Sequence, residues 1–199
     1  PARFFSWRIR GNPISFISRY AEELAQKYDF MVVTSMVDLA TLKGLAPSLS
    51  KIPSIVYFHE NQFEYPKSER QKSMLEAQMV NLYSAMAADS VIFNSEFNQA
   101  TFIDGCEQLM NKLPDFTLTD LPKRILQKSS VIPVPIADHL FEYSHCDVFP
   151  NSPLKILWNH RWEYDKGPDR LLLFLIELRE RQIPFEINIV GEQFRNVPP

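Results

Sequence analysis

Six short runs of β-branched and aromatic residues recur along the chain, separated by segments with helical periodicity. The runs are Phe30–Thr34, Ser54–Phe58, Ser90–Phe93, Ser130–Val134, Lys155–Trp158 and Glu186–Val190. They lack the polar alternation of half-exposed strands, and near-continuous apolar strands are typical of parallel sheets covered on both faces. The helical segments are Ile14–Lys27, Ser73–Ala88, Glu96–Met110 and Pro168–Arg181. This alternation predicts an α/β fold with parallel sheets.

The segment Phe141–Pro153 interrupts this alternation, because it holds two prolines and shows no periodicity. We expect it to be a linker. One Rossmann-like domain is then predicted over residues 1–150, and the start of a second over residues 151–199. The chain begins at Pro1, without a Met, and ends at Pro199, just past a predicted core strand. We therefore expect a piece of a longer protein, without the first strand of one domain and with the other truncated.

The composition argues against several classes of protein. Of the 199 residues 45% are hydrophobic and 23% charged, as in soluble globular proteins. A net charge of −3 is not that of a general nucleic-acid binder. No apolar run approaches the roughly 20 residues of a membrane span, so we expect no membrane partner. Cys106 and Cys146 fit no metal or redox spacing and indicate a reducing, cytoplasmic location.

Ligands bind beyond the carboxyl ends of the strands in open α/β sheets, so the residues after each strand are candidates. The polar residues that follow Ser54–Phe58 are His59, Glu60, Asn61 and Gln62. They predict either a ligand-facing cluster, with His59 as a polar or acid/base contact, or a loop that caps the next helix.

Two further strand ends carry weaker candidates. Asn94 and Ser95 follow Ser90–Phe93, where capping of the next helix is the favoured interpretation. The functional alternative is that the capped helix points free N–H groups at a ligand. Asp138 follows the Pro133 and Pro135 turn, and we rank a side-chain to backbone bond there above a functional role.

Residues 158–170, WNHRWEYDKGPDR, join a predicted strand to a predicted helix. Pro168 suits the first helical position, where a missing N–H costs nothing. Arg161 and Lys166 would then bracket an electropositive helix N-terminus, a site for a dianion such as a diphosphate. The alternative is a solvated loop in which Glu163 and Asp165 pair with the two cations. Spacing alone leaves both interpretations open.

The first ten residues, PARFFSWRIR, interleave three arginines with three aromatic residues. Such a mixture can stack on bases and contact phosphates, so Arg3, Trp7, Arg8 and Arg10 are candidate contacts to an RNA acceptor. The alternative, which we favour slightly, is a solvated edge whose aromatic side chains pack inward. The net negative charge argues against a broad RNA surface but not against a local one.

Several segments resemble retaining glycosyltransferases of the two-domain GT-B fold. ILWNHRWEYDKGPDRLL resembles the opening of their second domain, VIFNSEFNQATF a preceding strand-plus-serine segment, and INIVGEQF, which contains Glu192, their Val-Gly-Glu-Gly strand end. VIPVPIADHLF resembles their crossover stretch, with Asp138 and Phe141 matching and Val134-Pro135 replacing Asn-Gly. The resemblance implies that Arg161 and Lys166 contact the diphosphate of a nucleotide-sugar donor.

A closer resemblance covers nearly the whole chain. YFHENQFEYP, AADSVIFNSEFN, NHRWEYDKGPD and the N-terminal PARFFSWRIR are similar to glycosyltransferase-like proteins that transfer mannose from GDP-mannose to queuosine in tRNA. This implies a mannosyltransferase with a nucleotide sugar and tRNA as partners. Family members begin with a strand and a glycine-containing loop, and they grip the donor with two glutamates beyond the position of Pro199. We therefore expect the piece to be inactive alone.

The mechanism that the resemblance implies is front-face transfer with retention, in which Arg161 and Lys166 stabilise the leaving diphosphate without a metal or cofactor. His59 would contact the sugar or the acceptor. Glu60 is the nearby carboxylate for the alternative, a double displacement. Two rival functions stay open: a nucleotide-sugar epimerase of the same architecture, and a non-catalytic module that binds nucleotide sugar or RNA.

Overall fold

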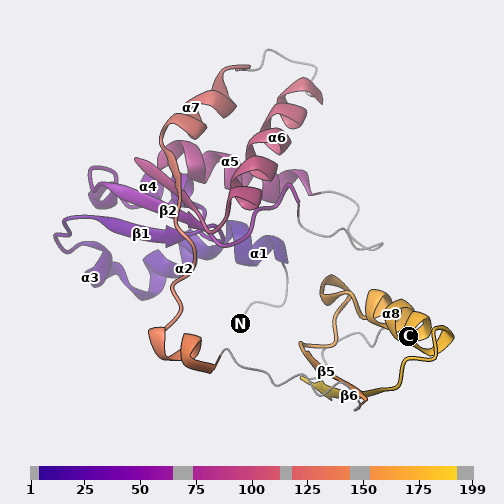
Figure 1. Ribbon diagram of the computed structural model, residues 1–199. Helices are drawn as coiled ribbons and strands as arrows, with labels where there is room; N and C mark the ends of the chain where they lie inside the picture. Colours follow the sequence, from indigo (N-terminus) through magenta and orange to yellow (C-terminus); the bar gives the residue numbers. More distant parts are fainter. Residues whose placement is uncertain (1–4, 65–73, 113–117, 144–152, 192–199) are drawn as a thin grey trace. The chain divides into compact units, whose positions relative to one another are not determined.

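The computed structural model describes residues 5–64, 74–112, 118–143 and 153–191. They fall into two compact units, Pro1–Ile136 and Ala137–Pro199 (Figure 1). The predicted boundary between residues 150 and 151, and most of the predicted linker, lie at residues 144–152, outside the described residues. That boundary stays a prediction.

The first unit contains a sheet with the strand order β1-β2-β3-β4, in which each neighbouring pair is parallel. The strands are β1 (Met31–Thr34), β2 (Ser54–Phe58), β3 (Ser90–Phe93) and β4 (Ser129–Val131). The helices are α1 (Phe5–Arg10), α2 (Asn12–Arg19), α3 (Ala21–Leu24), α4 (Leu39–Leu45), η1 (Pro47–Leu49), α5 (Leu75–Ala87), α6 (Glu96–Lys112) and α7 (Leu121–Gln127). The predicted α/β fold with a parallel sheet is confirmed.

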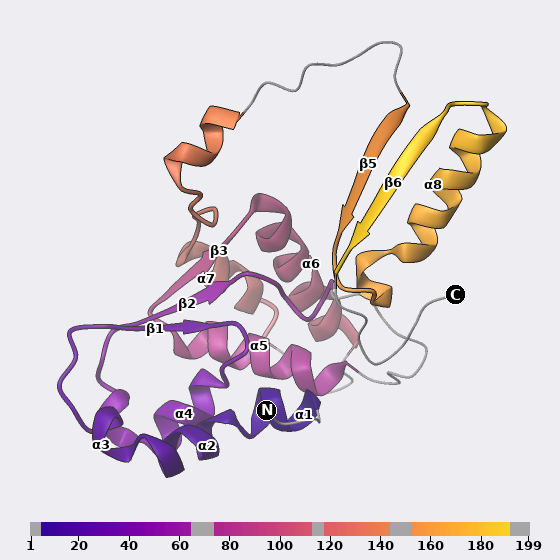
Figure 2. The ribbon, with the colours of Figure 1, turned by 90° about the horizontal axis from the view of Figure 1, so that it is seen from below.

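The core lies between one face of this sheet and the helices α4, α5 and α6. The strand residues that point into it are Val33, Val56, Phe58, Val91 and Phe93. Phe58 stacks on Phe93 with ring centroids 5.1 Å apart, and Phe102 of α6 packs edge-on against Phe58 at 4.8 Å. Figure 2 shows α4 and α5 along this side of the sheet.

Most strand boundaries follow the sequence prediction. β2 and β3 match it residue for residue. The predicted strand Ser130–Val134 is wrong at its end, because β4 stops at Val131. Pro133 and Pro135 carry no N–H group, so they cannot continue the hydrogen-bond ladder.

The helices differ more from the prediction. The expected helix Ile14–Lys27 is two helices, α2 and α3, because Tyr20 leaves helical geometry with φ −132° and ψ 34°. The helices α1, α4 and α7 were not predicted. α4 begins where the Asp38 carboxylate accepts a hydrogen bond from the Thr41 N–H at 3.1 Å. α1 places Ile9 in a buried cluster on α5, a contact that local sequence does not contain.

The second unit is a strand–helix–strand element. Its parts are η2 (Asp138–Tyr143), β5 (Leu154–Asn159), η3 (Tyr164–Lys166), α8 (Pro168–Glu180) and β6 (Phe185–Val190). β5 and β6 pair in parallel. Gly167 precedes α8 with φ +70°, a conformation that glycine adopts at little cost. Pro168 opens α8, as the sequence predicts. None of the helices described in either unit is long and apolar enough to cross a membrane.

We expect Phe102→Ala to lower the free energy of unfolding by about 3–5 kcal/mol, because it removes a fully buried ring that contacts three others. Phe97→Ala on the same helix should change it by less than about 0.5 kcal/mol, since 68% of Phe97 is exposed. Urea unfolding of the two variants measures both values. Equal losses would contradict this packing of α6.

Candidate functional site

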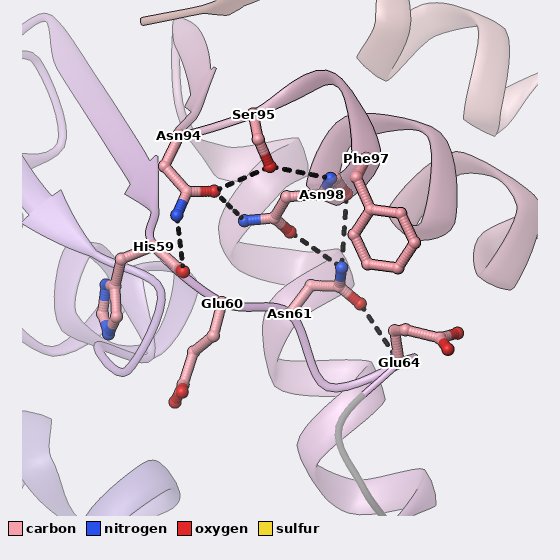
Figure 3. A pocket seen from close by; sticks show the side chains of 8 residues that line it. All are labelled: His59, Glu60, Asn61, Glu64, Asn94, Ser95, Phe97 and Asn98. Atoms are coloured by element: carbon pink, nitrogen blue, oxygen red, sulfur yellow. Dashed lines mark hydrogen bonds between the residues drawn. The ribbon is translucent and has the colours of Figure 1, made fainter. Parts of the chain in front are cut away.

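A pocket of about 250 Å³ opens at the carboxyl ends of β2 and β3 (Figure 3). One wall is the loop that follows β2, and the other is the N-terminal end of α6. The lining residues are His59, Glu60, Asn61, Glu64, Asn94, Ser95, Phe97 and Asn98. This is the edge of a parallel sheet at which ligands bind.

Two buried asparagines hold the walls of the pocket together. The amide nitrogen of Asn61 donates to Asn98 Oδ1 at 2.8 Å and to Thr101 Oγ1 at 3.0 Å. The amide nitrogen of Asn98 donates to the Phe58 carbonyl at 2.9 Å and to Asn94 Oδ1 at 2.8 Å. These bonds tie the end of β2, the loop after it and the first turns of α6 into one network. The pocket is thus preorganised by side chains that face inward.

A third buried asparagine, Asn81 of α5, also holds the loop after β2. Asn81 is fully buried, and its Oδ1 accepts a hydrogen bond from the Gln62 N–H at 2.9 Å. Its amide nitrogen donates to the Ser35 carbonyl at 2.9 Å. Asn81 therefore joins the loops that follow β1 and β2. The Gln62 side chain is 2% exposed, and its Oε1 has no hydrogen-bond partner in the described structure.

The loop after β2 is also anchored to α6 by an aromatic contact. Asn61 Oδ1 accepts the N–H groups of Phe63 at 2.9 Å and Glu64 at 3.1 Å, which turns the chain. Phe63 then packs edge-on against Phe102 at 5.3 Å. A Cβ at Gly105 would lie 2.4 Å from Phe63 Cβ, so the absence of a side chain at Gly105 admits this contact.

The residues after β3 act as a helix cap. Ser95 Oγ accepts a hydrogen bond from the Asn98 N–H at 3.2 Å, which satisfies one of the free donors at the start of α6. The amide nitrogen of Asn94 donates to the His59 carbonyl at 3.0 Å and so fixes the start of the opposite wall.

The side chains of His59 and Glu60 take no part in the hydrogen-bond network of the buried asparagines. His59 is exposed, and its carbonyl is the group held by Asn94. In Figure 3 the His59 ring and the Glu60 carboxylate project away from the amide network. Neither side chain has a hydrogen bond or ion pair within the described structure. These two groups are available to a ligand at the pocket.

The structure thus brings together five of the strand-end candidates: His59, Glu60, Asn61, Asn94 and Ser95. Gln62 lies buried beside them. Sequence reasoning missed Glu64, Phe97, Asn98 and Asn81. Asn98 lies three residues after the cap at Ser95 and therefore in the first turn of α6. This spacing could have identified Asn98 from the sequence. Nothing in the local sequence marks Asn81, because its partners come from two loops that are distant in the chain.

In the second unit, the loop after β5 carries its cations in ion pairs. Arg161 lies 3.4 Å from Glu163, and Lys166 lies 3.1 Å from Asp165. These are the pairs that the solvated-loop interpretation expects. The loop leads directly into the N-terminus of α8, which starts at Pro168. The side chains of Arg161 and Lys166 are 51% and 34% exposed, so both remain accessible.

Three of the N-terminal candidates, Trp7, Arg8 and Arg10, lie on α1. Arg10 donates to the buried Asp38 carboxylate at 2.9 Å, which gives it a structural partner. The Arg8 guanidinium lies 5.9 Å from the centre of the Phe5 ring. Trp7 is half exposed, and its indole covers Gly11, where a Cβ would lie 2.4 Å from the ring. Arg3 lies outside the described residues.

Two further candidates, Asp138 and Glu192, belong to the second unit. Asp138 opens η2 and is exposed, and the expected bond from its carboxylate to the turn is not seen within the described residues. Glu192 lies outside the described residues.

The described residues contain no group of three or more His, Cys, Asp or Glu that could hold a metal ion. Cys106 is buried on α6, and this burial raises the pKa of its thiol to about 12. The thiol is therefore protonated at neutral pH and is a packing residue rather than a nucleophile. Cys146 lies outside the described residues.

Comparison with known proteins connects this geometry to one family. Residues 1–136 match the family described as tRNA-queuosine alpha-mannosyltransferase N-terminal. The chain belongs to this family. The matched residues coincide with the first compact unit, which contains the pocket.

A relative of the tRNA-queuosine alpha-mannosyltransferase family extends the similarity to the second unit. The Drosophila melanogaster protein named "tRNA-queuosine alpha-mannosyltransferase" is 34% identical over 207 residues, which cover 100% of this chain and 54% of that protein. The chain therefore spans about half the length of the curated relative. The closer resemblance seen in the sequence is confirmed.

We expect Gly105→Ala to lower the free energy of unfolding by about 1–3 kcal/mol, because the new methyl group overlaps Phe63. Gly44→Ala is the matched control, since Gly44 also lies within a helix and a Cβ there meets nothing within 4 Å. It should gain about 0.5–1 kcal/mol from helix propensity. Denaturant titration gives both values, and a gain at both positions would contradict the contact between Phe63 and Gly105.

Proposed function

We propose that the full-length protein transfers mannose from GDP-mannose to queuosine in tRNA, in the cytoplasm. The observation that carries this proposal is the match of residues 1–136 to the N-terminal part of tRNA-queuosine alpha-mannosyltransferases. The similarity to the Drosophila melanogaster protein across the whole chain supports it. Because the chain spans about half of that protein, we assign the activity to the full-length protein rather than to residues 1–199.

In this proposal the loop after β5 contacts the donor diphosphate. The loop presents Arg161 and Lys166 beside the N-terminus of α8, and helix N-termini favour anions. The partner of Arg161, Glu163, does not prevent this role, because ion pairs near the surface contribute little stability. Lys166 can keep its bond to Asp165, whose side chain is 9% exposed, because an ammonium group has three N–H donors. A diphosphate offers each cation a stronger, charge-assisted contact. We therefore infer that Arg161 exchanges Glu163 for the diphosphate when the donor binds, and that Lys166 contacts the diphosphate while it keeps Asp165.

The pocket of the first unit then serves the acceptor and the reacting sugar. His59 is exposed at its edge and supplies a polar or acid/base contact. In front-face transfer the enzyme provides no nucleophile, and the cations stabilise the leaving diphosphate as its charge grows. Glu60 would act as a nucleophile in a double displacement. We favour the front-face route, which leaves Glu60 for binding.

Contacts to the body of the tRNA are proposed for the exposed side of α1. Arg8 and Trp7 are exposed there, whereas Arg10 is held by Asp38. A cation and an aromatic ring on one short helix suit a local contact to phosphate and base. A contact of this size is compatible with the net charge of −3.

The full-length protein, incubated with tRNA bearing queuosine and with either GDP-mannose or UDP-glucose, tests the function. Mass spectrometry of the nucleosides should show one added hexose on queuosine with GDP-mannose alone. Donor hydrolysis without a modified nucleoside would point to another acceptor. A converted nucleotide sugar would indicate an epimerase, and tight binding without any product a non-catalytic module. Each of these three results would overturn the proposal.

We expect Arg161→Ala in the full-length enzyme to lower kcat by about 10²–10³-fold, as the loss of a charge-stabilising donor does in other enzymes. Arg179→Ala is the matched control, because Arg179 is an exposed arginine in the last turn of α8, away from the loop. Steady-state kinetics with GDP-mannose measures both. An unchanged rate for Arg161→Ala would remove the diphosphate role.

A further inference from the structure

The pocket contains one side chain that its polar neighbours do not explain. Phe97 lies in the first turn of α6 and is 68% exposed, while Phe93 and Phe102 on either side of it in the sequence are fully buried. The other lining residues are polar or charged. Figure 3 shows the Phe97 ring at the wall of the pocket, close to Glu64 and Asn61. An exposed ring in this setting offers a flat apolar face to a ligand.

The size of the pocket limits what this face can bind. Its volume is about 250 Å³, below the roughly 300–1,000 Å³ of pockets that enclose drug-sized ligands. It suits one ring-sized group and leaves the remainder of a large ligand outside. A single modified base that extends from an RNA strand has this form, because RNA-binding proteins commonly stack such bases on aromatic side chains.

The charge of the pocket indicates which group enters. Its lining contains the carboxylates of Glu60 and Glu64 and, among the described residues, no lysine or arginine. Neither carboxylate has an ion-pair partner within the described part of the chain. Two carboxylates repel a diphosphate and attract a cation. The donor phosphates are therefore disfavoured at this position, and a neutral or positively charged group is favoured.

We propose that Phe97 stacks on the modified base of the acceptor and that Glu64, which lies on the same side of the pocket, binds the protonated amine of that base. This inference rests on the proposed function, since queuosine is the acceptor it names. The base of queuosine carries a hydroxylated five-membered ring through a secondary amine, which is protonated at neutral pH. Guanosine, which queuosine replaces, carries no such cation. Phe97 and Glu64 thus determine specificity for the modified base.

Kinetics of the full-length enzyme with queuosine-bearing tRNA tests the stacking contact. Phe97→Ala should raise the KM for tRNA or lower kcat/KM for tRNA about 5- to 150-fold, the range of one base stacked on an aromatic ring. The KM for GDP-mannose should stay unchanged, and Phe97→Tyr should retain most of the activity. Phe30→Ala is the matched control, because Phe30 is 61% exposed and directly precedes β1, at the opposite end of the strands. Equal behaviour of Phe97→Ala and Phe30→Ala overturns the inference.

Binding measurements test the charge recognition without turnover. Fluorescence anisotropy compares tRNA bearing queuosine with the same tRNA bearing guanosine. The wild-type protein should prefer the queuosine form, and Glu64→Gln should weaken that binding about 5- to 150-fold while leaving the guanosine form unchanged. Glu76→Gln on α5 is the control for an exposed glutamate outside the pocket. Equal weakening of both tRNAs by Glu64→Gln overturns the charge recognition.

Different results would contradict the proposed function and the role of the pocket. If the wild-type enzyme transfers mannose and prefers queuosine, but Phe97→Ala and Glu64→Gln change neither, the inference about the pocket is wrong and the function stands. If the wild-type enzyme neither transfers mannose nor distinguishes the two tRNAs, both are wrong. An effect of Phe97→Ala on the KM for GDP-mannose alone would assign the ring to the donor and overturn its acceptor role.

Discussion

Buried asparagine side chains satisfy the backbone groups at the carboxyl ends of the strands, and the form of the pocket depends on them. Parallel strands end with carbonyl and N–H groups that no further strand pairs, and each would be costly to bury alone. Asn81 donates to the Ser35 carbonyl and accepts the Gln62 N–H, and Asn98 adds a second hydrogen bond to the Phe58 carbonyl, which also accepts the Asn94 N–H. Because these amides come from α5 and α6, the helices that cover the sheet also fix the loops of the site.

The candidate residues of the two units carry opposite charges, although they occupy corresponding positions in the fold. In each, the candidate residues follow the carboxyl end of a strand and lie beside the start of a helix. The pocket of the first unit offers carboxylates, amides and one exposed ring, whereas the loop after β5 offers two cations. A glycosyl transfer needs both, because the leaving diphosphate requires cations and the acceptor requires hydrogen-bonding and stacking groups. This division agrees with the proposed function, in which the first unit contacts the acceptor and the second unit the donor.

The ion pairs of the second unit show why one sequence pattern allowed two interpretations. Arg161 and Lys166 do pair with the neighbouring acids, as a solvated loop would. Arg161 is also exposed and Lys166 partly exposed, and both stand before α8, as a diphosphate site requires. The two descriptions are compatible, because the exposed pair of Arg161 can be replaced by a ligand with more charge, and Lys166 has donors left beside its bond to Asp165.

The sequence by itself determined the α/β class, strands β2 and β3, the start of α8 at Pro168 and the polar character of the loop after β2. These features depend on apolar periodicity, on the fixed geometry of proline and on strand ends, all of which are local. Only the tertiary structure decided that Asn61 and Gln62 face inward while His59 and Glu60 stay available, and that Phe97 is exposed between two buried rings. It also decided that Arg10 is held by Asp38 and that α1 forms at all. The physical reason is that burial, buried hydrogen bonds and ion pairs depend on which elements come together in space, and these partners lie far apart in the chain.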